Sequence, residues 1–213
     1  MIHKTCKMQP HSDIVLLVMA AGEASRMGSI KQVLPIFGIP LIDFQISRWR
    51  FAFRIDPIIV TGAYSEEIYQ QSDLKKVKWV HNINWESGLG SSIVSGIETC
   101  IKYHGDAKAC MLIVLDQVHI GPSHLIRLIE EWRRQPEQMI ASEFERTIGP
   151  PVIFPRGFWS KLSMINHTSG AGSFLYKNTD SLRKYPLPEA SFDLDSPPDY
   201  DFFLEQLKFP KIS

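Results

Sequence analysis

Long apolar runs are the clearest pattern in the chain. Residues 14–19, Ile-Val-Leu-Leu-Val-Met, contain no polar side chain. Apolarity that is continuous rather than alternating is typical of a strand covered on both faces, as in a parallel sheet. Further candidate strands lie at residues 57–61, 77–81, 110–115, 139–142 and 151–154. We therefore expect a mainly parallel sheet with buried central strands.

Apolar residues at helical spacing occupy the intervals between the earlier strands. The candidate helices are residues 41–53, 91–103 and 122–134. In the second of these, Ser91 or Ser92 is the expected N-cap. Strand and helix alternate until the region of Gln135, which predicts an α/β fold with a doubly wound, mainly parallel, Rossmann-like sheet. Prolines mark later loops, and Pro197 is expected to begin a final helix.

Length and charge limit the class of protein. The chain has 213 residues, which suits one domain over residues 1–213, with residues 1–13 as a flexible N-terminal extension. Lys plus Arg and Asp plus Glu both number 23, so the formal net charge is zero. This balance provides no field that would draw nucleic acid or an anionic membrane to the protein. The longest apolar run, residues 14–21, is too short to span a bilayer. We expect small-molecule ligands, without nucleic acid or membrane partners.

Cysteine usage indicates the compartment. Cys6, Cys100 and Cys110 are odd in number and lack a C-x-x-C spacing. A disulfide framework or a zinc site is therefore not expected. A reducing cytoplasm is the compartment that this pattern favours.

The segment after the first strand carries candidate phosphate ligands. It reads Ala20-Ala-Gly-Glu-Ala-Ser-Arg-Met-Gly-Ser-Ile-Lys31. The small residues Ala20, Ala21 and Gly22 let backbone N–H groups approach a polyphosphate closely. Arg26 can bind phosphate oxygens in bidentate fashion, and Lys31 can act as a point charge. The alternative is an ordinary βα loop with a surface arginine and lysine, because the segment is neither a P-loop nor a G-x-G-x-x-G fingerprint.

The same segment resembles a known family. The pattern Ala-Ala-Gly-x-x-x-Arg-Met-Gly-x-x-Lys, followed by Leu34-Pro35 and Gly38-Ile-Pro-Leu41, is similar to the signature of the molybdenum cofactor cytidylyltransferase type of nucleotidyltransferases. In that family the loop wraps a nucleoside triphosphate, with the matching arginine and lysine on its phosphates. The resemblance covers most of residues 14–205. It implies the nucleotidyltransferase variant of the Rossmann-like fold.

A second segment follows the family pattern at residues 82–92. It resembles Asn-x-x-Trp-x-x-Gly-x-x-x-Ser and leads into a predicted helix. Backbone donors and serine hydroxyls there can bind anionic or carbonyl groups. Together with one glycine at an earlier strand end, the candidate ligand-binding residues are Gly62, Asn82, Gly88, Ser91 and Ser92. The alternative is a capped loop whose Trp85 packs on the core.

Two aspartates are candidate magnesium ligands. Asp116 ends the strand at residues 110–115, and a carboxylate at the carboxyl edge of a parallel sheet suits magnesium. The resemblance implies the same role, and it adds Asp195 from the segment Phe192-Asp-Leu-Asp-Ser-Pro-Pro-Asp199, with Asp193 as the other choice. The alternative for Asp116 is that it caps a helix. The alternative for the second segment is that Asp195 or Ser196 caps the final helix. Arg26, Lys31 and Asp116 are the expected catalytic residues.

Several positions depart from the family pattern. The family commonly has Gly or Ser at the position of Ala24 and Pro at the position of Val118. Its Gly-Asp-x-Gly-Ala-Arg segment is replaced by His167-Thr-Ser-Gly-Ala-Gly172, so that Thr168 and Gly172 stand for the aspartate and the arginine. These changes concentrate in the second half of the chain, which the resemblance assigns to the acceptor substrate. His81 and His119 neighbour strand ends and could line the cleft, although a solvated histidine, or a buried one with its hydrogen bonds satisfied, is the simpler interpretation.

The resemblance implies a reaction and its ligands. It implies transfer of CMP from CTP to molybdopterin with Mg²⁺ as cofactor, and a molybdoenzyme as recipient of the product. Ala20-Ala21-Gly22 is more similar to the cytidylyl than to the guanylyl branch. Two alternatives stay open: a transferase acting on a sugar phosphate or another phosphorylated alcohol, and a non-catalytic nucleotide or cofactor carrier.

Overall fold

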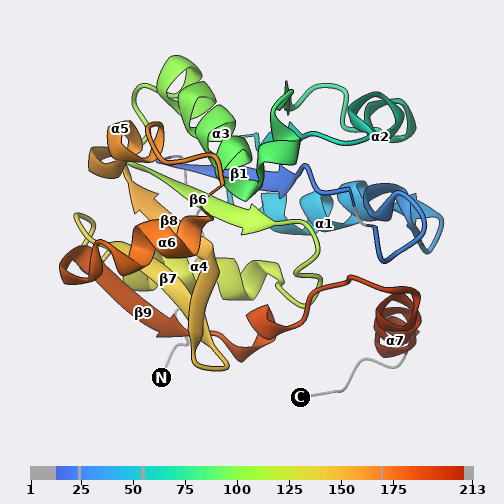
Figure 1. The fold of residues 1–213 in the computed structure, drawn as a ribbon. Coiled ribbons are helices and arrows are strands. Elements are labelled where there is room, and N and C mark those ends of the chain that lie inside the picture. The colour runs from blue at the N-terminus through green and yellow to red at the C-terminus, as the bar shows by residue number, and fades with distance from the viewer. Residues whose placement is uncertain (1–12, 24, 54–55, 169, 209–213) are drawn as a thin grey trace, which may run out of the picture.

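One seven-stranded sheet organises the structure. The computed structural model describes residues 13–23, 25–53, 56–168 and 170–208, so most of the expected extension at residues 1–13 lies outside the described residues. The sheet has the strand order β5-β4-β1-β6-β8-β7-β9 (Figure 1). Its strands are β1 (Ile14–Ala20), β4 (Ile58–Thr61), β5 (Lys78–His81), β6 (Ala109–Val114), β7 (Met139–Phe144), β8 (Thr147–Pro155) and β9 (Leu182–Pro186). A small hairpin pairs β2 (Pro35–Ile36) with β3 (Ile39–Pro40).

Helices cover both faces of the sheet. They are α1 (Leu41–Trp49), α2 (Ser65–Gln71), α3 (Leu89–Tyr103), α4 (Pro122–Trp132), α5 (Trp159–Leu162), α6 (Ala171–Tyr176) and α7 (Pro197–Lys208). Alternate residues of β1 enter different cores, because successive side chains of a strand point to opposite faces. Leu16 belongs to the core that includes residues of α1, α2 and α4, whereas Leu17 belongs to the core that includes residues of α3, α5 and α6. This arrangement confirms the doubly wound α/β fold.

The strand order places a crevice beside β1. β1 pairs in parallel with β4 on one side and with β6 on the other. From the carboxyl end of β1 the chain passes through α1 to β4 on one side, and from the carboxyl end of β6 it passes through α4 to β7 on the other side. The connections therefore leave the carboxyl ends of β1 and β6 in opposite directions, which creates the crevice where ligands bind in open α/β sheets.

The second half of the sheet is mixed. β8 is antiparallel to both β6 and β7, and β9 is parallel to β7. β9 and α2 were not predicted, because Leu182–Pro186 contains two basic residues and Ser65–Gln71 has one buried apolar residue, Ile68. The expected helix at residues 41–53 ends as an α-helix at Trp49 and continues as a 3-10 turn.

The expected N-cap of α3 was wrong. The helix begins at Leu89, and Gly88 is its N-cap with φ of 109°. A positive φ of this kind favours glycine. The turn at Gly88 therefore sets the start of the helix at Leu89, two residues before Ser91. Ser91 instead lies within 2.8 Å of the backbone oxygens of Asn84 and Gly88, to which its hydroxyl donates. The prediction that Pro197 begins the last helix is confirmed.

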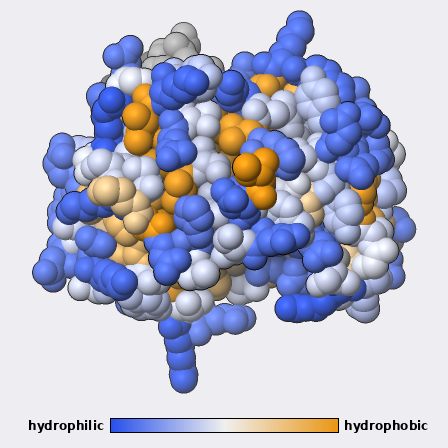
Figure 2. Space-filling view, turned by 45° about the horizontal axis from the view of Figure 1, so that its top comes forward, coloured by the Kyte–Doolittle hydropathy of each residue, from blue (hydrophilic) through white to orange (hydrophobic). Residues whose placement is uncertain are grey.

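The surface adds two observations. On the face shown in Figure 2, hydrophobic surface occurs as small groups separated by hydrophilic side chains. Among the helices that the structure describes, none is long and apolar enough to cross a membrane.

Candidate active site

The loop after β1 is fixed by a buried glutamine. Gln32 lies in the 3-10 turn Lys31–Val33, and its Nε2 donates hydrogen bonds to the backbone oxygens of Ala20 at 3.0 Å and Gly22 at 2.9 Å. These bonds tie the end of β1 to the following turn, and Ala63 N–H donates to the backbone oxygen of Ala21 from the neighbouring loop. The loop that carries the predicted phosphate ligands is therefore held from two sides.

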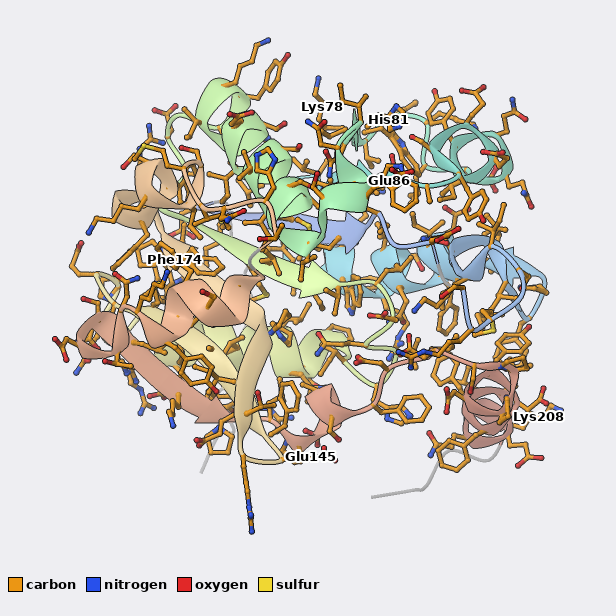
Figure 3. The ribbon with its side chains drawn as sticks, in the orientation of Figure 1. Lys78, His81, Glu86, Glu145, Phe174 and Lys208 are labelled. Carbon is orange, nitrogen blue, oxygen red and sulfur yellow. The ribbon has the colours of Figure 1, made fainter. Side chains whose placement is uncertain are left out.

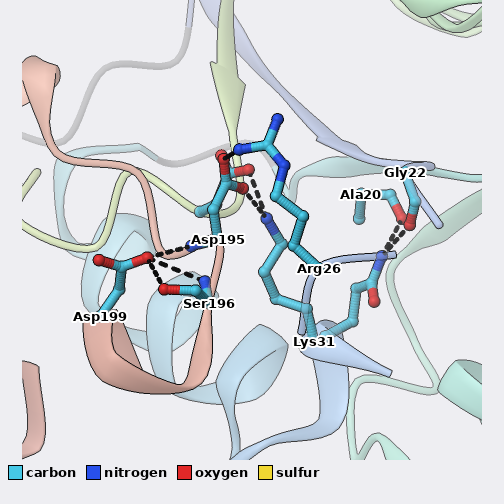
Figure 4. Close-up of polar contacts among 9 residues, drawn as sticks. Ala20, Gly22, Arg26, Lys31, Asp195, Ser196 and Asp199 are labelled. Atoms are coloured by element: carbon cyan, nitrogen blue, oxygen red, sulfur yellow. Dashed lines mark hydrogen bonds and ion pairs between the residues drawn. The ribbon is translucent and has the colours of Figure 1, made fainter. Parts of the chain in front are cut away.

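Lys31 joins two carboxylates from distant parts of the chain. Its Nζ lies 2.7 Å from Asp116 Oδ2 and 3.0 Å from Asp195 Oδ1 (Figure 4). Arg26 approaches the other oxygen of Asp195 at 3.5 Å, with a side chain that is 79% exposed. The structure thus brings together four of the residues singled out from the sequence, Arg26, Lys31, Asp116 and Asp195.

The pKa of Lys31 reflects these neighbours. Burial acts to lower the pKa of the ammonium, but the charges and hydrogen bonds of Asp116 and Asp195 outweigh it and raise the pKa above its ordinary value. Lys31 therefore carries a positive charge throughout the physiological range. It supplies a permanent cation at the carboxyl ends of β1 and β6.

Asp193 is the third carboxylate of this region. Partial burial, followed by the negative charges of Asp116 and Asp195, raises the pKa of Asp193 to about 6. The Asp193 side chain retains contact with solvent. Asp195, and not Asp193, makes the direct contact with Lys31.

Backbone contacts set the position of Asp195 relative to Asp116. Leu194 is fully buried, and its N–H donates to the backbone oxygen of Asp116 at 3.0 Å. Val118 N–H donates to the same oxygen at 2.8 Å, a bond that a proline at this position would lack. The departure from the family pattern at Val118 therefore adds a backbone hydrogen bond to the turn that begins at Asp116.

The start of α7 holds the other side of Asp195. Asp199 accepts hydrogen bonds from Ser196 Oγ at 2.6 Å, Ser196 N at 2.9 Å and Asp195 N at 3.3 Å. This network satisfies N–H groups that precede the helix, so the side chain of Asp195 is free to face Lys31. The alternative that Asp195 itself caps the helix is not what the structure shows, because its carboxylate contacts Lys31 and Arg26.

The four charged residues line one cavity, which we call the ionic pocket. Its volume is about 270 Å³. Its lining residues are Met19, Ala20, Gly22, Ser25, Arg26, Lys31, Gln32, Leu115, Asp116 and Asp195. The pocket therefore combines a glycine-containing loop, two cations and two carboxylates.

A second cavity, the tryptophan pocket, adjoins the first. Its volume is about 420 Å³, and it shares Met19, Gly22 and Asp116 with the ionic pocket. The other lining residues are Ala21, Glu23, Trp85, Glu86, Gly88, Leu89, Ser92 and Val114. Because Gly22 and Asp116 belong to both cavities, one ligand can extend from the ionic pocket into the tryptophan pocket.

Gly62 makes room for Trp85 and lines neither of the two cavities. A Cβ on Gly62 would lie 2.4 Å from Trp85 Cβ and 2.8 Å from the backbone oxygen of Ala21. Only glycine allows the tryptophan to approach the loop this closely. Gly62 was predicted to bind the ligand, and its observed contact is with Trp85, which itself lines the tryptophan pocket.

Asn82 and the serines organise the segment that leads into α3. Asn82 is buried, and its Nδ2 donates to Ser91 Oγ at 2.8 Å and to Ser92 Oγ at 3.0 Å. Its Oδ1 accepts from Asn84 N at 3.0 Å. Of these residues only Ser92 lines the tryptophan pocket, and Gly88 lines it at the start of the helix. Asn82 and Ser91 therefore contribute by holding the loop.

The segment with the largest departures borders the tryptophan pocket. His167 O accepts a hydrogen bond from Ser91 N at 3.2 Å, and it would lie 3.4 Å from a Cβ on Gly88. Leu89 contributes a methyl group 3.8 Å from where a Cβ on Gly170 would lie. Thr168 Oγ1 bonds to Asn166 Oδ1 within the segment. Ala24, a further departure, lies outside the described residues.

The two histidines near strand ends line neither cavity. His81 ends the edge strand β5, where its side chain is exposed (Figure 3). His119 stacks on Phe192 with ring centroids 4.3 Å apart. The solvated interpretation therefore fits His81, whereas His119 packs on Phe192 and its buried Nε2 has no hydrogen-bond partner among the described residues.

Three residues of the site were missed from the sequence. Gln32 ties the phosphate loop, Asp199 positions Asp195, and Gln117 donates to the backbone oxygens of Pro150 at 2.8 Å and Ala190 at 3.0 Å. The spacing Ser196-x-x-Asp199 was an available signal for Asp199, because it resembles a capping box. No local pattern indicated Gln32 or Gln117, whose partners lie elsewhere in the sequence.

The residues of the ionic pocket fit a divalent cation. Two carboxylate oxygens from separate segments converge on one point, which the ammonium of Lys31 marks. Magnesium is commonly held by one or two carboxylates together with waters and substrate phosphates. Within the described residues there is no cluster of three or more His, Cys, Asp or Glu suited to a metal, so a substrate phosphate would have to complete the coordination.

Comparison with known proteins supplies the family. The model for the MobA-like NTP transferase domain matches residues 16–182. The molybdenum cofactor cytidylyltransferase of Escherichia coli strain K12 is 31% identical over 114 residues, which cover 50% of this chain and 58% of that protein. The match thus spans little more than half the length of this relative.

Solved structures support the same fold. A homologue of Mycobacterium tuberculosis Rv0371c from Mycobacterium sp. strain JC1 has a TM-score of 0.74 at 23% identity, covering 93% of this chain and 98% of that chain. Rv0371c from Mycobacterium tuberculosis H37Rv, in complex with manganese, has a TM-score of 0.69 at 21% identity. The match covers 91% of this chain and 99% of that chain. The chain belongs to the family of MobA-like NTP transferase domains and is therefore a nucleotidyltransferase-family protein.

Proposed function

We propose that this protein transfers CMP from CTP to a phosphorylated acceptor, molybdopterin or the molybdenum cofactor, and releases pyrophosphate. The observation that carries the proposal is the convergence of Lys31, Arg26, Asp116 and Asp195 in the ionic pocket. A triphosphate needs cations for its oxygens, and its metal ion needs carboxylates. Both sets of groups lie in this one cavity, at the carboxyl ends of β1 and β6.

The chemistry requires positioning more than side-chain reactivity. An oxygen of the acceptor phosphate attacks the α-phosphorus, a new phosphorus–oxygen bond forms, and the bond to the β-phosphate breaks as pyrophosphate leaves. The acceptor phosphate is already largely ionised near neutral pH, so no general base is needed. Arg26 and Lys31 neutralise the charge that develops on the leaving pyrophosphate, which is electrostatic stabilisation by groups already in place.

Asp116 and Asp195 are the proposed ligands of Mg²⁺. When bound, Mg²⁺ withdraws charge from the phosphate oxygens and holds them in a fixed orientation. Asp116 is set by β6, and Asp195 is set by Leu194 and Asp199. Rv0371c, which has a similar fold, was solved in complex with manganese, and this is consistent with a divalent cation in the proposal.

The tryptophan pocket suits the nucleoside better than the acceptor. It contains Glu23 and Glu86 and no basic residue. An acceptor phosphate would be repelled there, whereas the amino group of cytosine is a hydrogen-bond donor that carboxylates accept. The similarity to the Escherichia coli cytidylyltransferase supports the same choice of base.

A second candidate acceptor class follows from the altered segment. Residues 167–172 lack the aspartate and the arginine that the family pattern has, and His167 and Gly170 lie against Gly88 and Leu89. A different phosphorylated alcohol, such as a sugar phosphate, is therefore the alternative acceptor.

The proposed compartment is the cytoplasm, because Cys100 and Cys110 are both free thiols. A molybdoenzyme is the proposed recipient of the product.

Pyrophosphate release tests the proposal. The protein is incubated with Mg²⁺ and each of CTP, GTP, ATP and UTP, together with molybdopterin or a sugar phosphate. The proposal expects release with CTP and molybdopterin above every other pair. Release only with a sugar phosphate would favour the second class of acceptor. Nucleotide binding without release from any pair would favour a carrier.

A further inference from the structure

We propose that Lys31 and the divalent cation compete for Asp116 and Asp195, so that the cation enters the site together with the triphosphate and not before it. The inference rests on the proposed function, because it concerns the order in which the metal and the nucleotide bind. It assigns Lys31 a role in the nucleotide-free protein that differs from its role on the phosphates.

The first step is the location of the ammonium. Lys31 Nζ lies 2.7 Å from Asp116 Oδ2 and 3.0 Å from Asp195 Oδ1, and the lysine side chain is only 11% exposed. An ammonium at hydrogen-bond distance from both oxygens fills the position between them. Lys31 therefore supplies an internal cation that neutralises the two proposed metal ligands.

The second step is the incompatibility of the two cations. Mg²⁺ and Mn²⁺ bind carboxylate oxygens more closely than an ammonium does, and the bound ion would lie within a few ångströms of Lys31 Nζ. Two like charges at that distance repel strongly at the partly desolvated edge of a protein. A metal can therefore use both carboxylates only after the lysine has moved away.

The third step is where the lysine goes. The ionic pocket holds Lys31 and Arg26 beside the glycine-containing loop, and a polyphosphate there presents several anionic oxygens to both side chains. Lysine reaches on a flexible stem, so its ammonium can pass from the carboxylates to the phosphates without a change of backbone. Arg26, 3.5 Å from Asp195 and 79% exposed, can make the same exchange.

The exchange couples the two ligands. A triphosphate that takes Lys31 leaves two free carboxylates, and these raise the affinity for the metal that the phosphates also bind. By linkage, the metal raises the affinity for the triphosphate by the same factor. The protein would thus bind metal poorly when alone and bind the metal–nucleotide pair well.

Mn²⁺ alone is the probe that tests this competition. Free Mn²⁺ is counted by its electron paramagnetic resonance signal while wild type or Lys31→Met is added, without nucleotide. We expect Lys31→Met to bind Mn²⁺ at least about tenfold more tightly than wild type. Lys184→Met is the matched control, because Lys184 pairs with Glu143 at 3.1 Å and neither residue lines the two cavities. It removes the same charge and is expected to leave Mn²⁺ affinity unchanged.

Two further variants make the outcome decisive. Lys31→Gln replaces Lys31→Met if the latter does not give a wild-type melting profile. The double variant Lys31→Met/Asp116→Asn is expected to lose the gain, which locates the metal at these carboxylates. Equal Mn²⁺ affinity in wild type and in the folded Lys31 variant would overturn the inference, as would the same gain in Lys184→Met or in the double variant. Pyrophosphate release by wild type is measured separately, so a failure of the proposed function is recognised independently.

Discussion

Leu194 N–H donates a 3.0 Å hydrogen bond to the backbone oxygen of Asp116, which places the segment before α7 directly against the end of β6. Asp116 and Asp195, the two aspartates that contact Lys31, are 79 positions apart in the chain, and this bond brings their backbones together. The proposed metal ligands are thus held by backbone geometry, which makes substitutions of their side chains informative.

Arg26 is predicted to contribute binding energy for the triphosphate. Arg26→Ala removes a charged donor from the ionic pocket and should weaken CTP binding with Mg²⁺ by about 1.5–3 kcal/mol, the scale of a charged hydrogen bond. Calorimetric titration of wild type and Arg26→Ala with CTP and Mg²⁺ measures this loss of affinity. Arg50→Ala is the control, because Arg50 pairs with Asp56 and lines neither cavity. Unchanged CTP affinity in the Arg26 variant would remove Arg26 from the nucleotide site.

The base preference is predicted to favour cytosine. With equal concentrations of CTP and GTP in competition, more CMP than GMP should reach the acceptor. The choice of cytosine rests on the similarity to the cytidylyl branch at Ala20-Ala21-Gly22 and to the Escherichia coli enzyme. A preference for GTP would reject the cytidylyl assignment and leave the fold and the site geometry unaffected.

Asp193 is predicted to make stability depend on pH. Its pKa is raised from 3.8 to about 6, first by partial burial and then by Asp116 and Asp195. Because the folded state binds the Asp193 proton more tightly than the unfolded state does, the contribution of this proton to the unfolding free energy is fully present below about pH 4. It is lost as pH rises through about 6, where the side chain becomes charged in the folded protein. Asp193→Asn keeps the neutral form, so it should stabilise the metal-free protein at about pH 8. Because the side chain has solvent access, we expect about 1 kcal/mol, or about 2–4 °C in Tm.

Melting curves of both proteins across pH check this. The difference in Tm between Asp193→Asn and wild type should shrink as pH falls to about 4. A constant difference across that range would show that Asp193 does not titrate between the folded and unfolded states as described.

Gly62 is predicted to be intolerant of a side chain. Gly62→Ala would place a Cβ 2.4 Å from Trp85 Cβ and 2.8 Å from Ala21 O, and it should cost about 1–3 kcal/mol of unfolding free energy. Denaturant unfolding measures the cost. Gly105→Ala is the matched control, because a Cβ there meets nothing within 4 Å. Equal stability of the two variants would mean that Trp85 has room to shift.

The sequence predicted the parallel part of the fold well because continuous apolar runs have one simple cause, burial on both faces. It missed β9, whose residues Leu182–Pro186 are half-exposed, and it placed the start of α3 too late because the conformation of Gly88 is not visible in a pattern. Motif and strand-end position predicted Arg26, Lys31, Asp116 and Asp195 as site residues, and the structure brings these four side chains together. The contacts of Gln32 and Gln117 depend on tertiary packing, which no local pattern contains.

The most direct test of the proposed function is Mg²⁺-dependent pyrophosphate release by Asp116→Asn. The substitution keeps the shape of the residue and removes the charge at the end of β6. The account predicts that turnover with CTP and molybdopterin falls by at least about 100-fold, because a metal supplies several kcal/mol of transition-state stabilisation. The Tm without ligands should change little, since the lost contact with Lys31 is offset by relief of repulsion from Asp193 and Asp195. Turnover equal to that of wild type would contradict the assignment of Asp116 to the metal and with it the proposed site.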